Sequence, residues 1–116
     1  MNIDNAKSQM RKGMLEYCIL LLLRRQSSYA ADIIQQLKDA RLIVVEGTLY
    51  PLLTRLKNDG LLSYDWQEST MGPPRKYYVL TESGEEFLTE LDKAWNELAH
   101  TVSVLTTTDN DTNPNT

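Results

Sequence analysis

The segment from residue 46 to residue 62 limits the possible folds more than any other part of this 116-residue chain. Leucines recur there at the spacing of one helical face and the other positions are mostly polar or aromatic, so one face packs while the other can contact a partner. Pro51 suits the opening turns of a helix, which predicts a start between residues 45 and 48, and Gly60 predicts its end. The leucines expected to pack inward are Leu49, Leu52, Leu53 and Leu56.

Two strands are predicted directly after this helix. Residues 61–67 alternate in polarity, and residues 75–80 return as the second strand. Residues 69–74 between them contain a glycine and two prolines, which predicts a loop. An amphipathic helix followed at once by a hairpin is the order of a recognition helix and its wing.

Two helices are predicted before this unit. The first holds an apolar run that stops near residues 24–25, and it is the expected centre of the core. Ser27 or Ser28 can cap the second helix, which runs to about Asp39. The inward residues are expected to be Met10, Met14, Tyr17, Cys18, Leu21 and Leu22 in the first helix, and Ala30, Ile33, Ile34 and Leu37 in the second.

A long final helix, which Thr81 can cap, has the spacing of a coiled-coil seam. Its apolar residues step alternately by three and four positions, and such a seam predicts a partner subunit. The expected dimer interface is Leu88, Leu91, Trp95, Leu98, Val102 and Leu105. Threonine, asparagine and aspartate predominate afterwards, so residues 106–116 are expected to form a disordered tail.

Together these elements predict a mainly α fold with a small β-hairpin, arranged as a winged helix-turn-helix with a C-terminal dimerisation helix. Residues 1–81 would form a DNA-binding domain and residues 82–105 the dimerisation helix.

Hydroxyls, an aromatic ring and cations cover the outward face of the central helix, and these groups suit phosphates and base edges in a DNA groove. Arg75 and Lys76 lie beside the loop, where they can reach a phosphate or a narrow minor groove. Tyr77 and Tyr78 point to opposite faces of a strand, so one anchors the wing and the other contacts phosphate, with Tyr78 the candidate for contact. The plainer alternatives are a solvated helix face and an edge strand protected by charge. The expected DNA contacts on the helix are Thr48, Tyr50, Thr54, Arg55 and Lys57.

The net charge of −4 argues at first against a nucleic-acid partner, because phosphate binding usually leaves a basic footprint. The charges are unevenly distributed, however. Residues 1–60 hold 9 Lys or Arg and 6 Asp or Glu, whereas residues 61–116 hold 3 and 10, mostly in the final helix. DNA is therefore the expected partner, and the acidic balance leaves one alternative open: a dimeric winged-helix protein-interaction module without DNA binding.

Several motifs of the chain resemble, in order, those of the PadR family of bacterial transcriptional regulators. The resemblance implies a homodimeric repressor whose winged helices bind a pseudo-palindromic operator and whose C-terminal helix joins the partner subunit. Ala30, where the family often has glycine, and the short final helix are small departures. The motifs are residues 12–16 with 19–20 and Leu23; Tyr29 and Ile33; residues 46–53 with 55–56 and 60–62; and residues 72–78 with 80–81 and Gly84.

In some multidrug-responsive members of that family, an aromatic residue of the last helix lines a cavity between subunits where flat, apolar ligands stack. The resemblance therefore implies a site for a small aromatic or apolar effector at Met10, Met14 and Trp95. Ordinary core or interface packing is the alternative for all three side chains.

Nothing in the chain predicts an enzyme, a metal site or a cofactor. Cys18 lies in an apolar run and His100 stands far from it in sequence, so they form neither a metal site nor a nucleophilic pair. The carboxylates of the final helix form a solvated face rather than an acid and base in a pocket. The apolar run at residues 18–23 is too short to span a bilayer and no export signal precedes it, which predicts a cytoplasmic protein.

Overall fold

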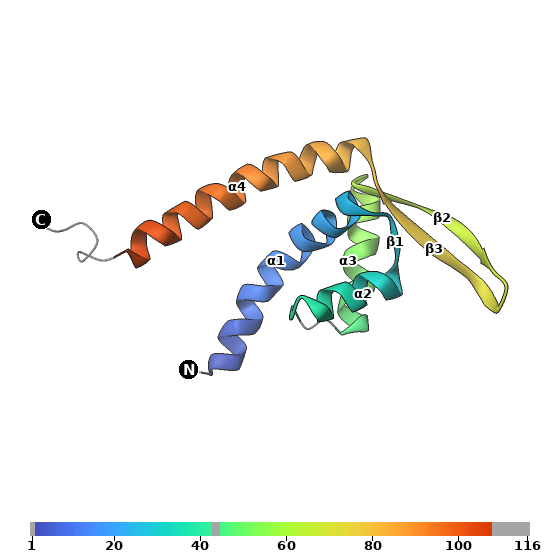
Figure 1. The fold of residues 1–116 in the computed structure, drawn as a ribbon, viewed down its shortest axis with the longest axis horizontal. Helices are drawn as coiled ribbons and strands as arrows, with labels where there is room; N and C mark the ends of the chain where they lie inside the picture. The colour runs from blue at the N-terminus through green and yellow to red at the C-terminus, as the bar shows by residue number, and fades with distance from the viewer. Residues whose placement is uncertain (1, 43–44, 108–116) are drawn as a thin grey trace, which may run out of the picture.

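The computed structural model describes residues 2–42 and 45–107 and arranges them as a helical core with a projecting hairpin (Figure 1). The predicted mainly α fold with a small hairpin is confirmed. Of the predicted tail, Thr106 belongs to the last helix and residues 108–116 lie outside the described residues. The elements are α1 (Ile3–Arg25), β1 (Ser28–Tyr29), α2 (Ala30–Asp39), α3 (Glu46–Asn58), β2 (Leu62–Ser69), β3 (Gly72–Leu80) and α4 (Glu82–Thr106).

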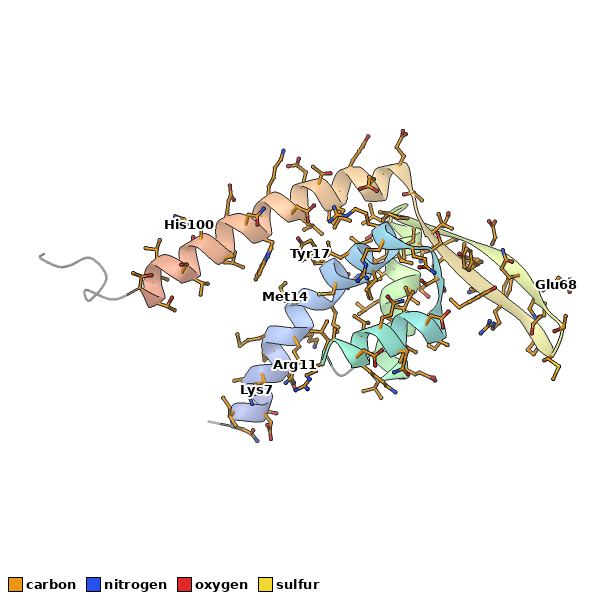
Figure 2. All side chains as sticks on the ribbon, in the orientation of Figure 1. Lys7, Arg11, Met14, Tyr17, Glu68 and His100 are labelled. Carbon is orange, nitrogen blue, oxygen red and sulfur yellow. The ribbon has the colours of Figure 1, made fainter. Side chains whose placement is uncertain are left out.

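The second half of α1 lies in the core, but through a different stripe from the one expected. Met10 is 74% exposed, and Met14 and Tyr17 lie on the flank of α1 that faces α4 (Figure 2). Tyr17, Cys18, Leu21 and Leu22 pack only partly against the core. The buried residues are Leu15, Ile19, Leu20 and Leu23 of α1, Ile33, Ile34 and Leu37 of α2, and Leu49, Leu53 and Leu56 of α3.

A short strand before α2 was missed by the sequence analysis. The described sheet has three antiparallel strands in the order β1-β3-β2, and Ser28 pairs with Tyr78 across it. Ser28 is buried and donates its hydroxyl to the Gln26 carbonyl at 3.1 Å, so it does not cap α2. Tyr29 occupies the N-cap position without a side-chain hydrogen bond, and the predicted serine cap is wrong.

The hairpin formed by β2 and β3, called the wing below, is longer than predicted. β2 continues to Ser69 and β3 begins at Gly72, so Pro73 and Pro74 lie in a strand and not in a loop. The strand register shifts between Gln67 and Ser69, opposite the prolines. A break in the ladder is where missing N–H donors are tolerated, which explains why the two prolines do not end the strand.

Gly60 ends α3 as predicted. Its φ of 80° lies in the left-handed region, its N–H donates to the Lys57 carbonyl, and the Leu61 N–H donates to the Leu56 carbonyl, both at 3.0 Å. These paired bonds satisfy the last carbonyls of the helix and turn the chain directly into β2.

The start of α4 is fixed against the end of α3. The predicted Thr81 cap is confirmed, because its hydroxyl oxygen accepts from the Gly84 N–H at 2.9 Å. The same hydroxyl donates to the Gly60 carbonyl at 2.7 Å. Gly84 is buried, and a Cβ at this position would overlap the Leu61 carbonyl oxygen. Only glycine therefore lets α4 begin so close to the turn after α3.

Away from this contact, α4 diverges from α1 and leaves an open angle between the two helices (Figure 1). The radius of gyration is 18.0 Å, whereas a compact domain of this length would have about 13 Å. The far half of α4 is therefore not covered by the described part of the chain.

Candidate nucleic-acid interface

The central helix α3 divides as predicted into an inward and an outward face. Leu49, Leu53 and Leu56 are buried and Leu52 is packed partly against the core. The predicted contact residues Thr48, Tyr50, Thr54, Arg55 and Lys57 are all exposed. Burial of the leucines fixes the rotation of α3, so the hydroxyls and cations necessarily face outward.

The exposed residues of α3 fall on two flanks. Tyr50 lines a cleft with the wing, and by helical spacing Lys57 lies on the same flank. Thr48 and Arg55 line the groove between α3 and α1 on the opposite flank, and Thr54 lies between the two. The outward face of α3 is therefore bordered by the wing on one side and by α1 on the other.

Arg55 is exposed but not free. Its guanidinium forms an ion pair with Glu16 of α1, and the two side chains are 57% and 40% exposed. The pair ties α3 to α1, and a phosphate at this position would have to share the guanidinium with the carboxylate.

The two wing cations rest on aromatic rings. The Arg75 guanidinium carbon lies 3.9 Å from the centre of the Tyr29 ring. The Lys76 ammonium lies 4.5 Å from the Tyr64 ring and 5.5 Å from the Trp66 ring. An aromatic face attracts a cation, so these rings restrict the positions of both charged groups.

These aromatic supports were missed by the sequence analysis. Trp66 and Lys76 are register partners in the hairpin, and Tyr64 lies two residues from Trp66 on the same strand face. A correctly registered hairpin would have revealed both contacts. The contact with Tyr29 depends on β1, which pairs Tyr29 with Tyr77, and two residues are too short a strand to find by periodicity.

Tyr78 is buried, which argues against its predicted role as a DNA contact. It is 4% exposed, belongs to the buried core, and its ring centre lies 5.6 Å from that of Tyr64. Burial raises the pKa of its phenol above the ordinary value. Tyr78 is the residue that anchors the wing. Tyr77, on the other face, makes an edge contact with Tyr29 at 5.1 Å between ring centres.

A cleft of about 280 Å³ lies between the wing and the starts of α2 and α3. It brings the predicted contacts Tyr50, Arg75 and Lys76 together on one surface. Tyr29, Ala30, Ala31, Trp66, Pro74 and Tyr78 complete its lining.

The predicted seam of α4 divides into two parts. Leu88 is fully buried in the core of its own chain and Leu91 packs partly against the same core, so assigning Leu88 to a dimer interface was wrong. The first part of α4 packs against α1, whereas its later part has no neighbour in the described chain. The spacing of apolar residues is the same in both parts and does not reveal this difference. Trp95, Leu98, Val102 and Leu105 are exposed, from 41% at Trp95 to 77% at Leu105.

The three residues predicted to bind an effector lie around one hollow. Met10 and Met14 of α1 face Trp95 of α4 across a cavity of about 610 Å³. Its other lining residues are Leu98, Ala99, Val102, Ser103 and Thr106, so the hollow is largely apolar.

At the closed end of this hollow, three side chains join α1 to α4. The Tyr17 hydroxyl donates to Asp92 at 2.6 Å and the Arg24 guanidinium donates to the other carboxylate oxygen at 2.7 Å. Both hydrogen bonds lower the pKa of Asp92, and the bond from Arg24 has the larger effect. Loss of hydration and then the bond to Asp92 raise the pKa of Tyr17 to about 12. We call Tyr17, Arg24 and Asp92 the α1–α4 tie.

No group of three or more histidine, cysteine or acidic side chains in the part of the chain that the structure describes could hold a metal ion. No described helix is both long and apolar enough to cross a membrane. Burial raises the pKa of the Cys18 thiol, which disfavours the reactive thiolate.

Comparison with known proteins agrees with a DNA-binding role for the surface formed by α3 and the wing. A sequence model of the transcriptional regulator PadR-like family matches residues 19–90. Among solved structures, a PadR-like transcription factor from Bacteroides fragilis is 72% identical, with a TM-score of 0.75 and coverage of 87% of this chain and 98% of that one. A PadR family transcriptional regulator from Eggerthella lenta is 32% identical, with a TM-score of 0.84 and coverage of 92% and 94%.

A transcriptional regulator of Mycobacterium tuberculosis is 40% identical over 74 residues, which are 64% of this chain and 68% of the relative. The family match extends over more than half of the chain and includes α2, α3 and the wing. The chain therefore belongs to the PadR-like family of transcriptional regulators.

Proposed function

We propose that this DNA-binding regulator is a homodimeric repressor that acts in the cytoplasm on a pseudo-palindromic operator. Each subunit would place α3 in a major groove, with the two half-sites about one helical turn apart. The observation that carries the proposal is the fixed rotation of α3, whose leucines are buried while Thr48, Thr54 and Lys57 are exposed. The family consists of transcriptional regulators rather than enzymes, in agreement with the absence of catalytic motifs.

The wing supports the same orientation. Arg75 and Lys76 lie beside Tyr50 of α3 on one cleft, so a sugar–phosphate strand that borders the groove would meet all three side chains. Tyr29 and Tyr64 hold the two cations before DNA arrives, which reduces the conformational entropy lost on binding.

The far half of α4 supports a second copy of the chain as the partner. Its exposed Trp95, Leu98 and Val102 line the hollow with α1, and a soluble protein rarely leaves such a surface open to water. The α4 helix of a partner would cover Trp95, Leu98, Val102 and Leu105. Leu88 is buried in its own chain and is excluded from this proposed interface, whereas the half-buried Leu91 lies at its edge.

An effector would bind in what remains of the hollow after the partner closes its open side. Trp95 offers a ring face for stacking, and Met10 and Met14 offer adaptable apolar contacts. A flat, apolar or aromatic molecule matches this lining. Its binding would change the angle between α1 and α4, and with it the distance between the two α3 helices.

Selection from a pool of random duplexes tests the proposal. The purified protein should enrich an inverted repeat, and its affinity should fall steeply with salt because each neutralised phosphate adds roughly 0.9 to the log–log slope. Expression of a reporter gene placed behind the selected sequence should fall when the protein is present. Failure to enrich any sequence would favour the protein-interaction module, and a rise in reporter expression would make the protein an activator.

A further inference from the structure

We propose that the first three turns of α1 form a second phosphate-binding surface for double-stranded DNA, on the side of α3 opposite the wing. We call its cationic residues, Lys7, Arg11 and Lys12, the basic face of α1. The inference rests on the proposed function, because it assumes that α3 enters the major groove. It assigns a role to a segment in which the sequence analysis found no DNA contact.

The side chains of this segment are distributed around α1 in a definite way. Arg11 and Lys12 line a groove of about 440 Å³ together with Thr48 at the start of α3. Lys12 also lines the adjoining groove of about 470 Å³, in which Thr48 and Arg55 of α3 lie. The basic face is therefore continuous with the outward face of α3. Figure 2 places Lys7 and Arg11 on this N-terminal half of α1.

Helical spacing explains why these residues share one side. A single helical stripe has residues at intervals of three or four positions and their immediate neighbours. This pattern is met by Ser8, Arg11, Lys12 and Leu15, which are spaced by three, one and three residues. Lys7 lies one turn before Arg11 and two turns before Met14, so it stands at the border between this stripe and the flank of the methionines. Met10 and Met14 lie on the flank that lines the hollow with α4. The same helix thus divides between the proposed dimer side and the proposed DNA side.

The charges of the segment favour an anionic partner. Two acidic residues of α1 lie near the basic face, and Glu16 is already engaged by Arg55. Asp4 lies in the first turn, where it interacts favourably with the helix dipole. With Asp4 counted, residues 3–13 hold three cations and one acid, a net charge of +2 in a chain whose net charge is −4. Such a concentration of positive charge matches a row of phosphates.

The first turns of α1 are helical although they add no buried residue to the core. The Asn2 side chain accepts hydrogen bonds from the Asp4 and Asn5 N–H groups at 2.8 and 3.3 Å, which caps the helix. Ile3 and Met10 in these turns remain exposed. The cap and the helix together space the cations at helical intervals along α1.

The dimensions of DNA agree with this placement. The major groove is about 12 Å wide, close to the diameter of a helix with its side chains, so a phosphate strand borders each flank of an inserted helix. The wing meets the strand on the Tyr50 flank. The basic face of α1 lies on the Thr48 flank, where the other strand would pass.

The test compares the salt dependence of DNA binding among single-charge variants of the full chain. The variants are Arg11→Gln and Lys12→Gln, and the control is Lys93→Gln on α4, which removes the same charge far from α3. Glutamine has a helix propensity close to that of lysine and arginine, so α1 should stay folded. The probes are the duplex selected by the wild-type protein and an unselected random duplex.

Each α1 variant should lower the log–log salt slope by roughly 0.9 per lost phosphate contact, which is about fivefold in affinity at 0.15 M salt. The loss should be equal on both duplexes, because phosphate contacts carry no sequence information. Lys93→Gln should match the wild type. If the wild-type protein binds DNA and both α1 variants keep its log–log salt slope, this inference is overturned while the proposed function stands. Absence of wild-type binding would remove the proposed function and the inference together.

Discussion

Tyr17 of α1 and Asp92 of α4 are joined by a 2.6 Å hydrogen bond, and Arg24 holds the other oxygen of the same carboxylate. This tie is the last polar link between the two helices before they diverge around the apolar hollow. The angle between the DNA-binding unit and the proposed dimer helix therefore depends on three side chains near the surface.

The α1–α4 tie should make stability depend on pH at both ends of the range. The pKa of Asp92 is lowered in the folded chain, so its contribution is complete above 3.8, the ordinary value, and is lost as the pH falls through the folded value. The pKa of Tyr17 is raised, so its contribution is complete below 10.0 and is lost between 10.0 and about 12.

Denaturant unfolding at a series of pH values measures both effects. The stability difference between the wild type and Asp92→Asn should narrow as the pH falls through the acidic range. Tyr17→Phe should remove a tyrosine that ionises at about pH 12 from an ultraviolet pH titration. A difference between wild type and Asp92→Asn that stays constant with pH would show that the tie does not stabilise the fold.

Gly84 should tolerate no side chain. In Gly84→Ala the new methyl group would overlap the Leu61 carbonyl oxygen and lie 2.7 Å from a methyl carbon of Leu80, so we expect a loss of about 1–3 kcal/mol or more in unfolding free energy. Gly13→Ala is the matched control, because no atom lies within 4 Å of its new methyl group. That control should gain about 0.5–1 kcal/mol, since alanine favours a helix interior. Equal denaturation midpoints for the two variants would contradict the close approach of α4.

The two parts of α4 should respond differently to mutation. Leu98→Asp places a charge on the proposed interface and should convert a dimer into a folded monomer, as measured by sedimentation. Leu88→Ala should instead lower the unfolding free energy by about 2–5 kcal/mol, because Leu88 is fully buried in its own chain. A Leu98→Asp protein that remains dimeric would place the interface elsewhere.

The ring of Tyr29 should matter for DNA binding through Arg75. Tyr29→Leu removes the aromatic face and should weaken DNA binding by about two- to fivefold, corresponding to the 0.5–1 kcal/mol of an exposed cation–π contact. Tyr29→Phe keeps the face and should bind like the wild type. In an Arg75→Ala background, Tyr29→Leu should have no further effect. An undiminished effect in that background would mean that Tyr29 acts independently of Arg75.

Local rules predicted much of this fold because each signal lay within a few residues. The leucine face of α3, its end at Gly60 and the Thr81 cap all follow from neighbouring side chains and backbone groups. The exposed contacts on α3 followed directly, since burying one face exposes the other.

The errors arose where distant segments decide the structure. Ser28 looks like a helix cap in sequence, yet it is paired with Tyr78, fifty residues away in the chain. Leu88 has the spacing of a dimer seam, but it is buried in the core of its own chain, where α4 packs against α1. The alternation of side chains along β3 does not by itself show whether Tyr77 or Tyr78 faces the core.

Because α4 diverges from α1 beyond Asp92, a small change in the tilt of this segment moves its far end by a large distance. The segment from residue 92 to residue 106 is roughly 20 Å long at 1.5 Å per residue, so tilting it by about 10° would displace its far end by about 3.5 Å. One base-pair step along duplex DNA is about 3.4 Å. In the proposed dimer, a ligand or a proton that alters the tilt by this amount would thus shift the separation of the two α3 helices by about one nucleotide step.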